Sequence, residues 1–229
     1  MQPDTGRAEL IKVARGLGGL LPHVAFVGGV IIELYLPATP ELEMRATTDV
    51  DCVIEAATIG PMHKIEQRLR DLGFTNDMSD GAHLCRWKYG NTTVDIMPAD
   101  EQGYGSSNRW YNEGLRTKKS FSLDGIQIWI FPLPVFVACK FEAFLDRGKG
   151  DYFMSHDWED IVMVLAESTG METEWVHASP AVKAYLRGRA IEIMGRADRD
   201  EIIYSQFDSD KRTPDRLARV IGRLELMQA

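Results

Sequence analysis

The run Asp49-Val50-Asp51 constrains this 229-residue chain more than any other feature. Apolar residues follow it at positions 52–54, a composition typical of a β-strand. Successive side chains of a strand point to opposite faces, so Asp49 and Asp51 are expected on the same face. Two carboxylates at that spacing repel each other unless a cation lies between them. The sequence therefore predicts a strand that presents a divalent-cation site, with Mg²⁺ favoured because its ligands are all oxygen, and Mn²⁺ also possible.

The composition indicates a soluble globular protein, since 45% of the residues are hydrophobic. The net charge of −8 argues against a nonspecific nucleic-acid coat and leaves room for a local basic groove. Three widely separated cysteines in apolar surroundings, Cys52, Cys85 and Cys139, predict free buried thiols. The polar N-terminus and the lack of a long apolar run lead us to expect a cytoplasmic protein with no membrane partner.

The secondary-structure pattern changes along the chain. Pro61 and Gly73 bracket an amphipathic helix, Gly90-Asn91 is typical of a hairpin turn, and residues 99–118 suggest a long loop. We expect strands at 23–27, 49–54, 74–78, 83–89, 92–97 and 126–131, and helices at 7–20, 30–36, 61–72, 134–147, 155–167, 179–193 and 213–227.

A boundary near residue 131 follows from this pattern. Residues 1–131 mix strands and helices, whereas residues 132–229 are helical nearly throughout. The predicted fold class is α+β: a small mixed β-sheet domain with flanking helices, followed by an α-helical C-terminal domain.

Two further features support a phosphate-handling site. Asp95 is the lone charge in a strand-like run, and three carboxylates on neighbouring strands can hold two Mg²⁺ ions that clamp an in-line phosphoryl or nucleotidyl displacement. Gly28-Gly29 ends a short apolar strand just before a predicted helix, where backbone N–H groups could face a phosphate. Alone, that glycine pair is as well explained by an ordinary strand-to-helix turn.

Together these motifs resemble the nucleotidyltransferase superfamily of the DNA polymerase β type. The pattern is Gly-Gly, a short helix, the run Arg45-Ala46-Thr47-Thr48-Asp49-Val50-Asp51, and a later strand aspartate. Within the superfamily it looks most like the AbiE-type branch of minimal nucleotidyltransferase toxins, which carry a lysine and a motif of the form R-D-x-x-D in a helical C-terminal half. The similar run here is His156-Asp157-Trp158-Glu159-Asp160, and the resemblance covers about residues 24–165.

The resemblance implies a role for each matching residue. Asp49, Asp51 and Asp95 would bind two Mg²⁺ ions, with Asp95 a candidate base for the attacking hydroxyl. Nucleotide would bind at the residues Gly28, Gly29, Arg45, Thr47, Lys140 and Arg147. The chain departs from the family pattern at Val30, where a serine or threonine is usual, and at His156, where a basic residue is usual.

Lys140 and Arg147 lie seven residues apart and so share a helical face. Lys140 is surrounded in sequence by apolar residues, which favours a side chain that points into a cleft over one on a solvated face. Asp157 and Asp160 also share a face. They could orient Lys140 or act near the acceptor, with Asp157 a catalytic candidate, or simply supply favourable first-turn acids.

A basic and aromatic cluster lies in or beside the loop at 99–118. Such a mixture suits a nucleic-acid backbone and stacked bases, although a solvated loop explains it slightly better. Its members are Arg109, Trp110, Tyr111, Arg116, Lys118 and Lys119.

The expected activity is Mg²⁺-dependent transfer of a nucleoside monophosphate from an NTP to a hydroxyl acceptor, with release of pyrophosphate. The toxin branch implies a tRNA 3′ end or a protein side chain as acceptor, and a cognate antitoxin as partner. One alternative is an aminoglycoside-type nucleotidyltransferase, which the acidic composition would suit. Another is a non-catalytic nucleotide-binding partner protein.

Overall fold

The computed structural model describes residues 5–37, 47, 49–56, 62–99 and 108–229. The chain divides into two compact units, each considered by itself below. The first comprises Met1–Ile31 and Glu41–Pro132, and the second comprises Ile32–Pro40 and Leu133–Ala229. The α+β fold class is confirmed.

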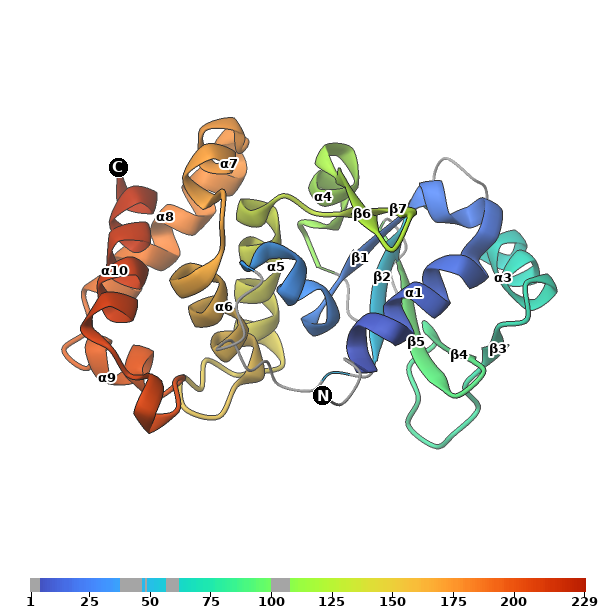
Figure 1. Cartoon of the computed structure of the whole chain (residues 1–229), viewed down its shortest axis with the longest axis horizontal. Coiled ribbons are helices and arrows are strands. Elements are labelled where there is room, and N and C mark those ends of the chain that lie inside the picture. Colours follow the sequence, from blue (N-terminus) through green and yellow to red (C-terminus); the bar gives the residue numbers. More distant parts are fainter. Residues whose placement is uncertain (1–4, 38–46, 48, 57–61, 100–107) are drawn as a thin grey trace. The chain divides into compact units, whose positions relative to one another are not determined.

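Within the described residues, the first unit is built on a seven-stranded mixed sheet with strand order β3-β4-β5-β2-β1-β7-β6 (Figure 1). The neighbours β2 and β5 run parallel, as do β1 and β7, and every other pair is antiparallel. The strands are β1 (Val24–Val27), β2 (Val50–Ile54), β3 (Thr75–Asn76), β4 (Arg86–Tyr89), β5 (Thr92–Pro98), β6 (Lys119–Leu123) and β7 (Ile126–Ile130).

Helices cover the centre of this sheet. Helix α1 (Thr5–Leu17), which continues as the 3₁₀ helix η1 (Gly18–His23), contacts β2, β5 and β7. Helix α4 (Tyr111–Thr117) contacts β1 and β2, whereas α3 (Met62–Asp71) buries its apolar stripe of Met62, Ile65 and Leu69. Every residue of β1 is buried, as expected for a central strand with both faces covered.

The two hairpins of the sheet differ in how well the sequence predicted them. The β4–β5 hairpin turns at Gly90-Asn91, as expected, and pairs Tyr89 with Thr92. The β6–β7 hairpin was missed, although Asp124 and Gly125 both adopt positive φ, of 50° and 77°, as a two-residue hairpin turn requires. Helix α4 also corrects the prediction of a loop throughout 99–118, because Tyr111 and Leu115 lie buried on one face of the helix.

The second unit is helical. It includes part of η2 (Gly29–Tyr35), a 3₁₀ helix where an ordinary helix was expected at 30–36. Short helices α7 and α9 were not predicted, since each spans two turns or fewer and gives little periodicity. The elements after residue 132 are α5 (Leu133–Asp146), α6 (His156–Glu167), α7 (Met171–His177), α8 (Pro180–Met194), α9 (Arg199–Tyr204), η3 (Ser209–Lys211) and α10 (Pro214–Gln228).

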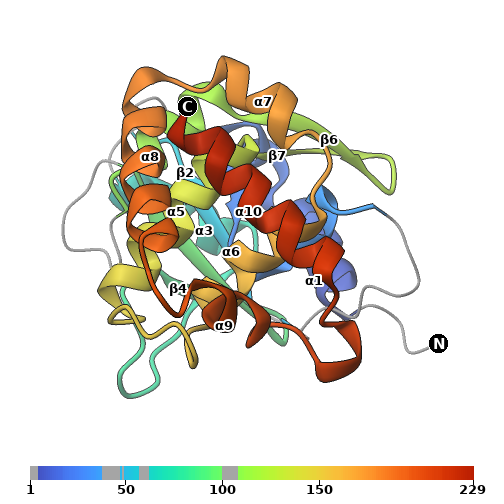
Figure 2. The same cartoon turned by 90° about the vertical axis from the view of Figure 1, so that its left-hand side faces the viewer.

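Helix α6 is the centre of the second unit. It contacts both α5 and α10, and α10 also contacts α8 (Figures 1 and 2). Trp158 is fully buried on α6, and its indole Nε1 donates to the Ile202 carbonyl at 2.9 Å. The ring of Tyr35 packs on Phe136 at 5.0 Å, which explains why residues 32–37 group with this unit.

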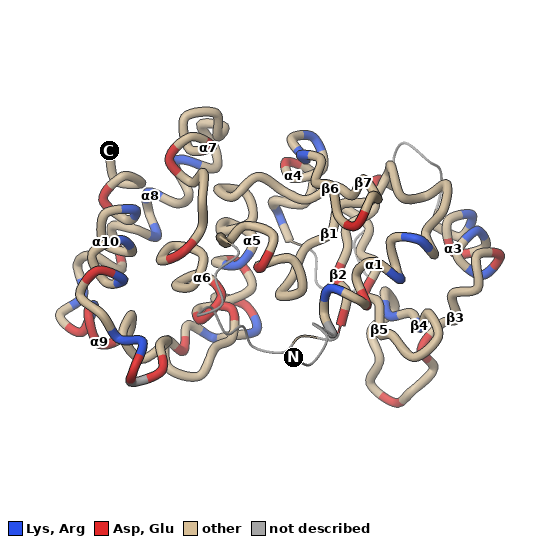
Figure 3. Tube along the Cα trace, in the orientation of Figure 1, with Lys and Arg blue, Asp and Glu red and all other residues tan. Residues whose placement is uncertain are grey.

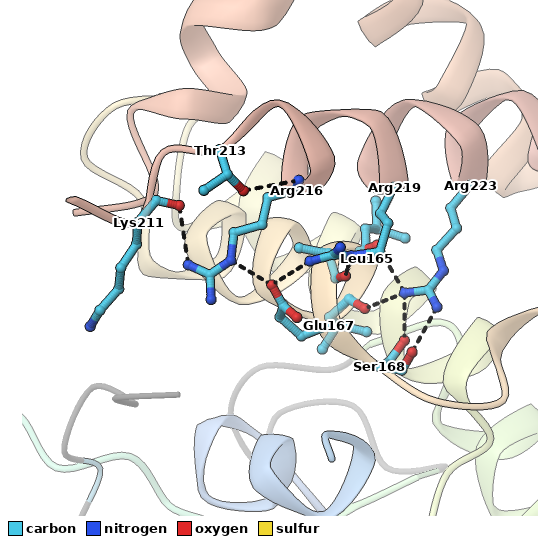
Figure 4. Close-up of polar contacts among 10 residues, drawn as sticks. Leu165, Glu167, Ser168, Lys211, Thr213, Arg216, Arg219 and Arg223 are labelled. Atoms are coloured by element: carbon cyan, nitrogen blue, oxygen red, sulfur yellow. Dashed lines mark hydrogen bonds and ion pairs between the residues drawn. The ribbon is translucent and has the colours of Figure 1, made fainter. Parts of the chain in front are cut away.

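A row of arginines on α10 closes the C-terminal end of α6 (Figure 4). The last carbonyls of a helix lack partners within the helix and need donors from elsewhere. Arg219 donates to the Ala166 carbonyl at 2.6 Å, and Arg223 donates to the carbonyls of Leu165 at 2.9 Å and Ser168 at 2.6 Å. Arg216 pairs with Glu167 at 2.7 Å. These bonds from arginine side chains to backbone carbonyls hold α6 against α10. A hydrophobic pattern in the sequence could not have predicted them.

Replacing Arg223 by alanine should lower the free energy of unfolding by about 1–3 kcal/mol, because it leaves partly buried carbonyls without donors. Urea unfolding followed by circular dichroism measures this. Arg187→Ala, at an exposed position on α8, is the control and should change stability by less than about 0.5 kcal/mol. Equal losses in the two variants would contradict a capping role.

No helix in the part of the chain that the structure describes is both long and apolar enough to span a membrane.

Candidate functional site

The sheet brings Asp51 and Asp95 together. Strands β2 and β5 are parallel neighbours, and these two aspartates are partners in their register. Register partners on adjacent strands project from the same face, with strands roughly 4.8 Å apart. Both side chains are half-buried, and Figure 3 marks acidic residues on these strands. The two carboxylates that the sequence placed in one site therefore do share one patch of the sheet.

Gly28 shapes the surroundings of Asp51. It directly follows β1, where Val27 pairs with Asp51 across the antiparallel β1–β2 ladder. Its φ is +75°, and a Cβ atom at this position would collide with the Asp51 carboxylate. The backbone of Gly28 thus lies against that carboxylate, and Gly29 then begins η2. Of the two glycines, Gly28 is the one whose lack of a side chain the site demands.

Arg86 is a site residue that the sequence analysis missed. It opens β4 and is the register partner of Asp95 in the β4–β5 hairpin. Its guanidinium forms a fork on the Asp95 carboxylate, with Nε to Oδ1 at 2.9 Å and a terminal nitrogen to Oδ2 at 2.8 Å. The two-residue turn at Gly90-Asn91 fixes this register, so counting back from the turn would have placed Arg86 opposite Asp95.

The carboxylates of this patch influence the pKa values of their neighbours. Hydrogen bonding to Asp95 raises the pKa of Arg86, and the charge of Asp49 adds to the effect. Burial raises the pKa of the Cys52 thiol, and the nearby carboxylates Asp51 and Asp95 raise it further. Burial also raises the pKa of Cys85, with help from Asp95, to about 11. Both thiols are therefore protonated at neutral pH and offer no thiolate ligand or nucleophile.

The donor chemistry of the patch suits a hard cation. Asp49, immediately before β2, is exposed, and Asp51 lies two residues on. Within the described residues, no three acidic, histidine or cysteine side chains are grouped closely enough to form a ready-made metal site. Asp95 is instead engaged by Arg86. Oxygen donors on Asp49 and Asp51 fit Mg²⁺, whereas Asp95 as a third metal ligand stays a prediction.

Of the other residues predicted to bind nucleotide in this unit, the structure describes one and leaves one undescribed. Thr47 is half-buried and makes a polar contact. Arg45 lies outside the described residues.

In the second unit, Lys140 lies between two aspartates. Its ammonium contacts Asp157 Oδ1 at 3.1 Å and Asp160 Oδ2 at 2.5 Å. Arg147, just past the end of α5, donates to both carboxylate oxygens of Asp157 in a fork, with two bonds of 2.8 Å. Two helical turns separate Lys140 from Arg147 and one turn separates the aspartates, so the predicted shared faces do meet across the α5–α6 contact.

This cluster is buried and electrically balanced. Burial disfavours the ammonium of Lys140, but the carboxylates of Asp160 and Asp157 outweigh that effect and raise its pKa. Burial likewise opposes ionisation of Asp157, yet the bonds from Arg147 and Lys140 lower its pKa. Lys140 is only 6% exposed, so its ammonium holds two carboxylates instead of facing an open cleft as expected. Arg147, with a side chain 64% exposed, is the accessible cation of the cluster.

The basic and aromatic cluster is largely engaged in local contacts. Lys118 donates to the Pro22 carbonyl at 2.7 Å and lies over the Trp129 ring, and Arg116 pairs with Glu113 at 2.7 Å. Arg109 stacks over the ring of Trp110. The solvated loop that the sequence slightly favoured is wrong for Trp110 and Tyr111, which are buried at the start of α4, and nucleic-acid binding by the cluster stays a prediction.

Comparison with solved structures identifies the fold as nucleotidyltransferase-like. An antigenic nucleotidyltransferase-like protein from Paracoccidioides brasiliensis superimposes with a TM-score of 0.50, at 16% identity, over 93% of this chain and 98% of that one. The antibiotic-resistance factor ANT(2″)-Ia gives a TM-score of 0.50 at 15% identity, over 82% of this chain and 94% of that one. No protein-family model matches the sequence, and no curated protein matches it either.

The contact between Gly28 and Asp51 predicts a specific cost for a side chain at position 28. Gly125→Ala has the same kind of positive φ but open space around it, and should lose about 1–2 kcal/mol of stability. Gly28→Ala should lose more, by roughly 1–3 kcal/mol, because the methyl group also displaces the carboxylate. Paired urea denaturation curves measure the difference. Equal losses would show that Asp51 moves aside freely.

The Lys140 cluster predicts a pH-dependent loss in Asp157→Asn. The folded-state pKa of Asp157 lies below its ordinary value of 3.8, so its stabilisation is present above that value and disappears as the pH falls through the folded pKa. At pH 7 the variant should lose roughly 3 kcal/mol, since the buried ammonium of Lys140 loses one of its two carboxylate partners and Arg147 loses the carboxylate that it forks. The loss should shrink below about pH 4.

The matched control is Asp146→Asn, at an exposed position at the end of α5. Unfolding free energies of both variants over pH 3 to 8 would separate the cases. A loss for Asp157→Asn that stays constant down to pH 3 would contradict the ion-pair account.

Proposed function

We propose that this protein is a Mg²⁺-dependent nucleotidyltransferase that transfers a nucleoside monophosphate from an NTP to a hydroxyl acceptor. The observation that carries the proposal is the pairing of Asp51 with Asp95 on parallel strands, with the backbone of Gly28 against Asp51. The nucleotidyltransferase-like fold agrees with it. Carboxylate oxygens are ligands that Mg²⁺ prefers, and a glycine lets the backbone approach a ligand closely.

Asp49 and Asp51 would hold the metal ion. A bound Mg²⁺ would supply charge neutralisation on the triphosphate and orient its reacting phosphorus. The carboxylate of Asp95 would accept the proton of the acceptor hydroxyl, and Arg86 would hold that carboxylate in place. Gly28 would let the triphosphate approach the backbone closely, and Arg45 and Thr47 would add polar contacts as the family motif implies.

In the helical unit, we assign Lys140 a positioning role. Its ammonium joins Asp157 to Asp160, and Asp157 in turn orients the guanidinium of Arg147. Arg147 is then the cation of this cluster that an anionic substrate can reach. Asp157 acts through Arg147 in this scheme, which leaves Asp95 as the only proton acceptor proposed.

Two acceptor classes follow from different observations. The motif resemblance to the AbiE-type branch favours a tRNA 3′ end or a protein side chain, with a cognate antitoxin as partner. Expression should then arrest growth, and Asp51→Ala should abolish the arrest. The fold likeness to the antibiotic-resistance factor ANT(2″)-Ia favours an aminoglycoside as acceptor instead.

The test is transfer of label from each of the four α-³²P-NTPs to total tRNA, to protein, or to an aminoglycoside. We expect label on one acceptor class and a loss of at least about 100-fold in Asp51→Asn, because the metal loses a charged ligand. Asp80→Asn, at an exposed position in the loop before β4, is the control and should retain full activity. Transfer that survives in Asp51→Asn would refute the assignment of this site.

A further inference from the structure

A pocket in the helical unit offers a second ligand site. It has a volume of about 510 Å³, within the roughly 300–1,000 Å³ of typical small-molecule sites. One wall is the segment that leads into α6, with Phe153, Met154 and His156, and the other is the segment before α10, with Phe207 and Arg212. The pocket residues are distinct from Asp49, Asp51 and Asp95, which belong to the other unit.

The apolar part of the pocket is unusually open. Phe153 is 51% exposed and Met154 is 79% exposed, whereas most large apolar side chains of this unit are buried. Phe207, by contrast, is buried, and the guanidinium of Arg216 lies over its ring at 5.3 Å from the centroid. An exposed phenylalanine beside a fixed one, on the wall of a pocket, provides a surface for a flat aromatic ligand.

The polar groups of the pocket carry both charges. The Nε atom of Arg212 donates to the Phe207 carbonyl at 3.0 Å, which holds the guanidinium at the pocket. Its terminal nitrogens make no ion pair within the described residues. Glu159 accepts from His156 at 3.1 Å and Asp208 pairs loosely with Lys211 at 3.4 Å, so two carboxylates line the same space. The pocket therefore combines one available guanidinium with two hydrogen-bond acceptors.

This combination decides between ligand classes. A polycation would be repelled by Arg212, and a polyanion would be repelled by Glu159 and Asp208. A purely apolar segment would bury all three charges without partners. A nucleotide unit satisfies each group at once. Its base stacks on an aromatic ring, its sugar hydroxyls donate to carboxylates, and its phosphate accepts from a guanidinium.

We infer that this pocket binds one nucleotide unit, with the base on Phe153, the ribose hydroxyls at Glu159 and Asp208, and a phosphate at Arg212. The inference rests on the proposed function in one respect: it makes a nucleotide of single-stranded RNA the natural occupant, because RNA is one of the proposed acceptors. A free nucleoside monophosphate has the same chemistry, and the experiment below distinguishes the two.

The test is direct binding in EDTA, without NTP, so that it does not depend on transfer. The full chain is titrated with a fluorescein-labelled five-nucleotide single-stranded RNA by anisotropy, and with AMP by calorimetry. Phe153→Ala should weaken RNA binding about tenfold or more, and Phe153→Tyr should restore it because stacking is retained. Arg212→Gln should weaken binding and reduce the salt dependence by about one phosphate contact.

Matched controls are Val176→Ala, another exposed apolar side chain of this unit, and Arg187→Gln on α8. Both should bind RNA as the unaltered protein does, and so should Asp51→Asn. If the protein binds the RNA tightly and AMP weakly, the pocket is a site for RNA. If AMP binds as tightly as the RNA does, the pocket is a site for free nucleotides. No binding of either, or binding that Phe153→Ala leaves unchanged, would overturn the inference.

The outcome is separable from that of the proposed function. RNA binding at the pocket without any NMP transfer would support the inference about the pocket and refute the proposed transferase activity. NMP transfer together with pocket variants that bind RNA and react normally would support the transferase activity and refute the inference about the pocket.

Discussion

The proximity of Asp51 and Asp95 is the constraint on which the account of the first unit depends. Adjacent parallel strands fix the two carboxylates on one patch, where their mutual repulsion opposes folding unless positive charge is supplied. Arg86 supplies part of it from the next strand, and Gly28 gives Asp51 space by having no side chain. A cation bound at Asp49 and Asp51, as proposed above, would add positive charge to the same patch.

The helical unit handles charge differently, by full internal balance. Two cations and two carboxylates meet between α5 and α6, and a buried pair of this kind costs most when one partner is removed. Helix α6 is thus held near its start by Lys140 and at its end by the arginines of α10. Phe153, just before α6, and His156, its first residue, line the pocket.

The sequence predicted those parts of the fold that short-range patterns encode. Alternation and apolar runs placed β1, β2, β5 and β7, and the turn at Gly90-Asn91 set the β4–β5 hairpin. Strand pairing places Asp51 beside Asp95, but a site of three carboxylates stays a prediction. Long-range contacts were not predicted: the fork of Arg86 on Asp95 depends on register, and the caps that α10 gives α6 join residues more than 50 positions apart. Lys140 is a further example, because its apolar neighbours in the sequence fit a lysine that faces a cleft and a lysine in a buried ion cluster equally well.

The most direct test of the central claim is a crystal structure with Mn²⁺ and a nonhydrolysable NTP, with data collected at the manganese edge. The account predicts an anomalous peak within coordination distance of Asp49 and Asp51, with the triphosphate against the backbone of Gly28. Nucleotide bound elsewhere, or no manganese peak at these aspartates with Arg86 still on Asp95, would contradict it.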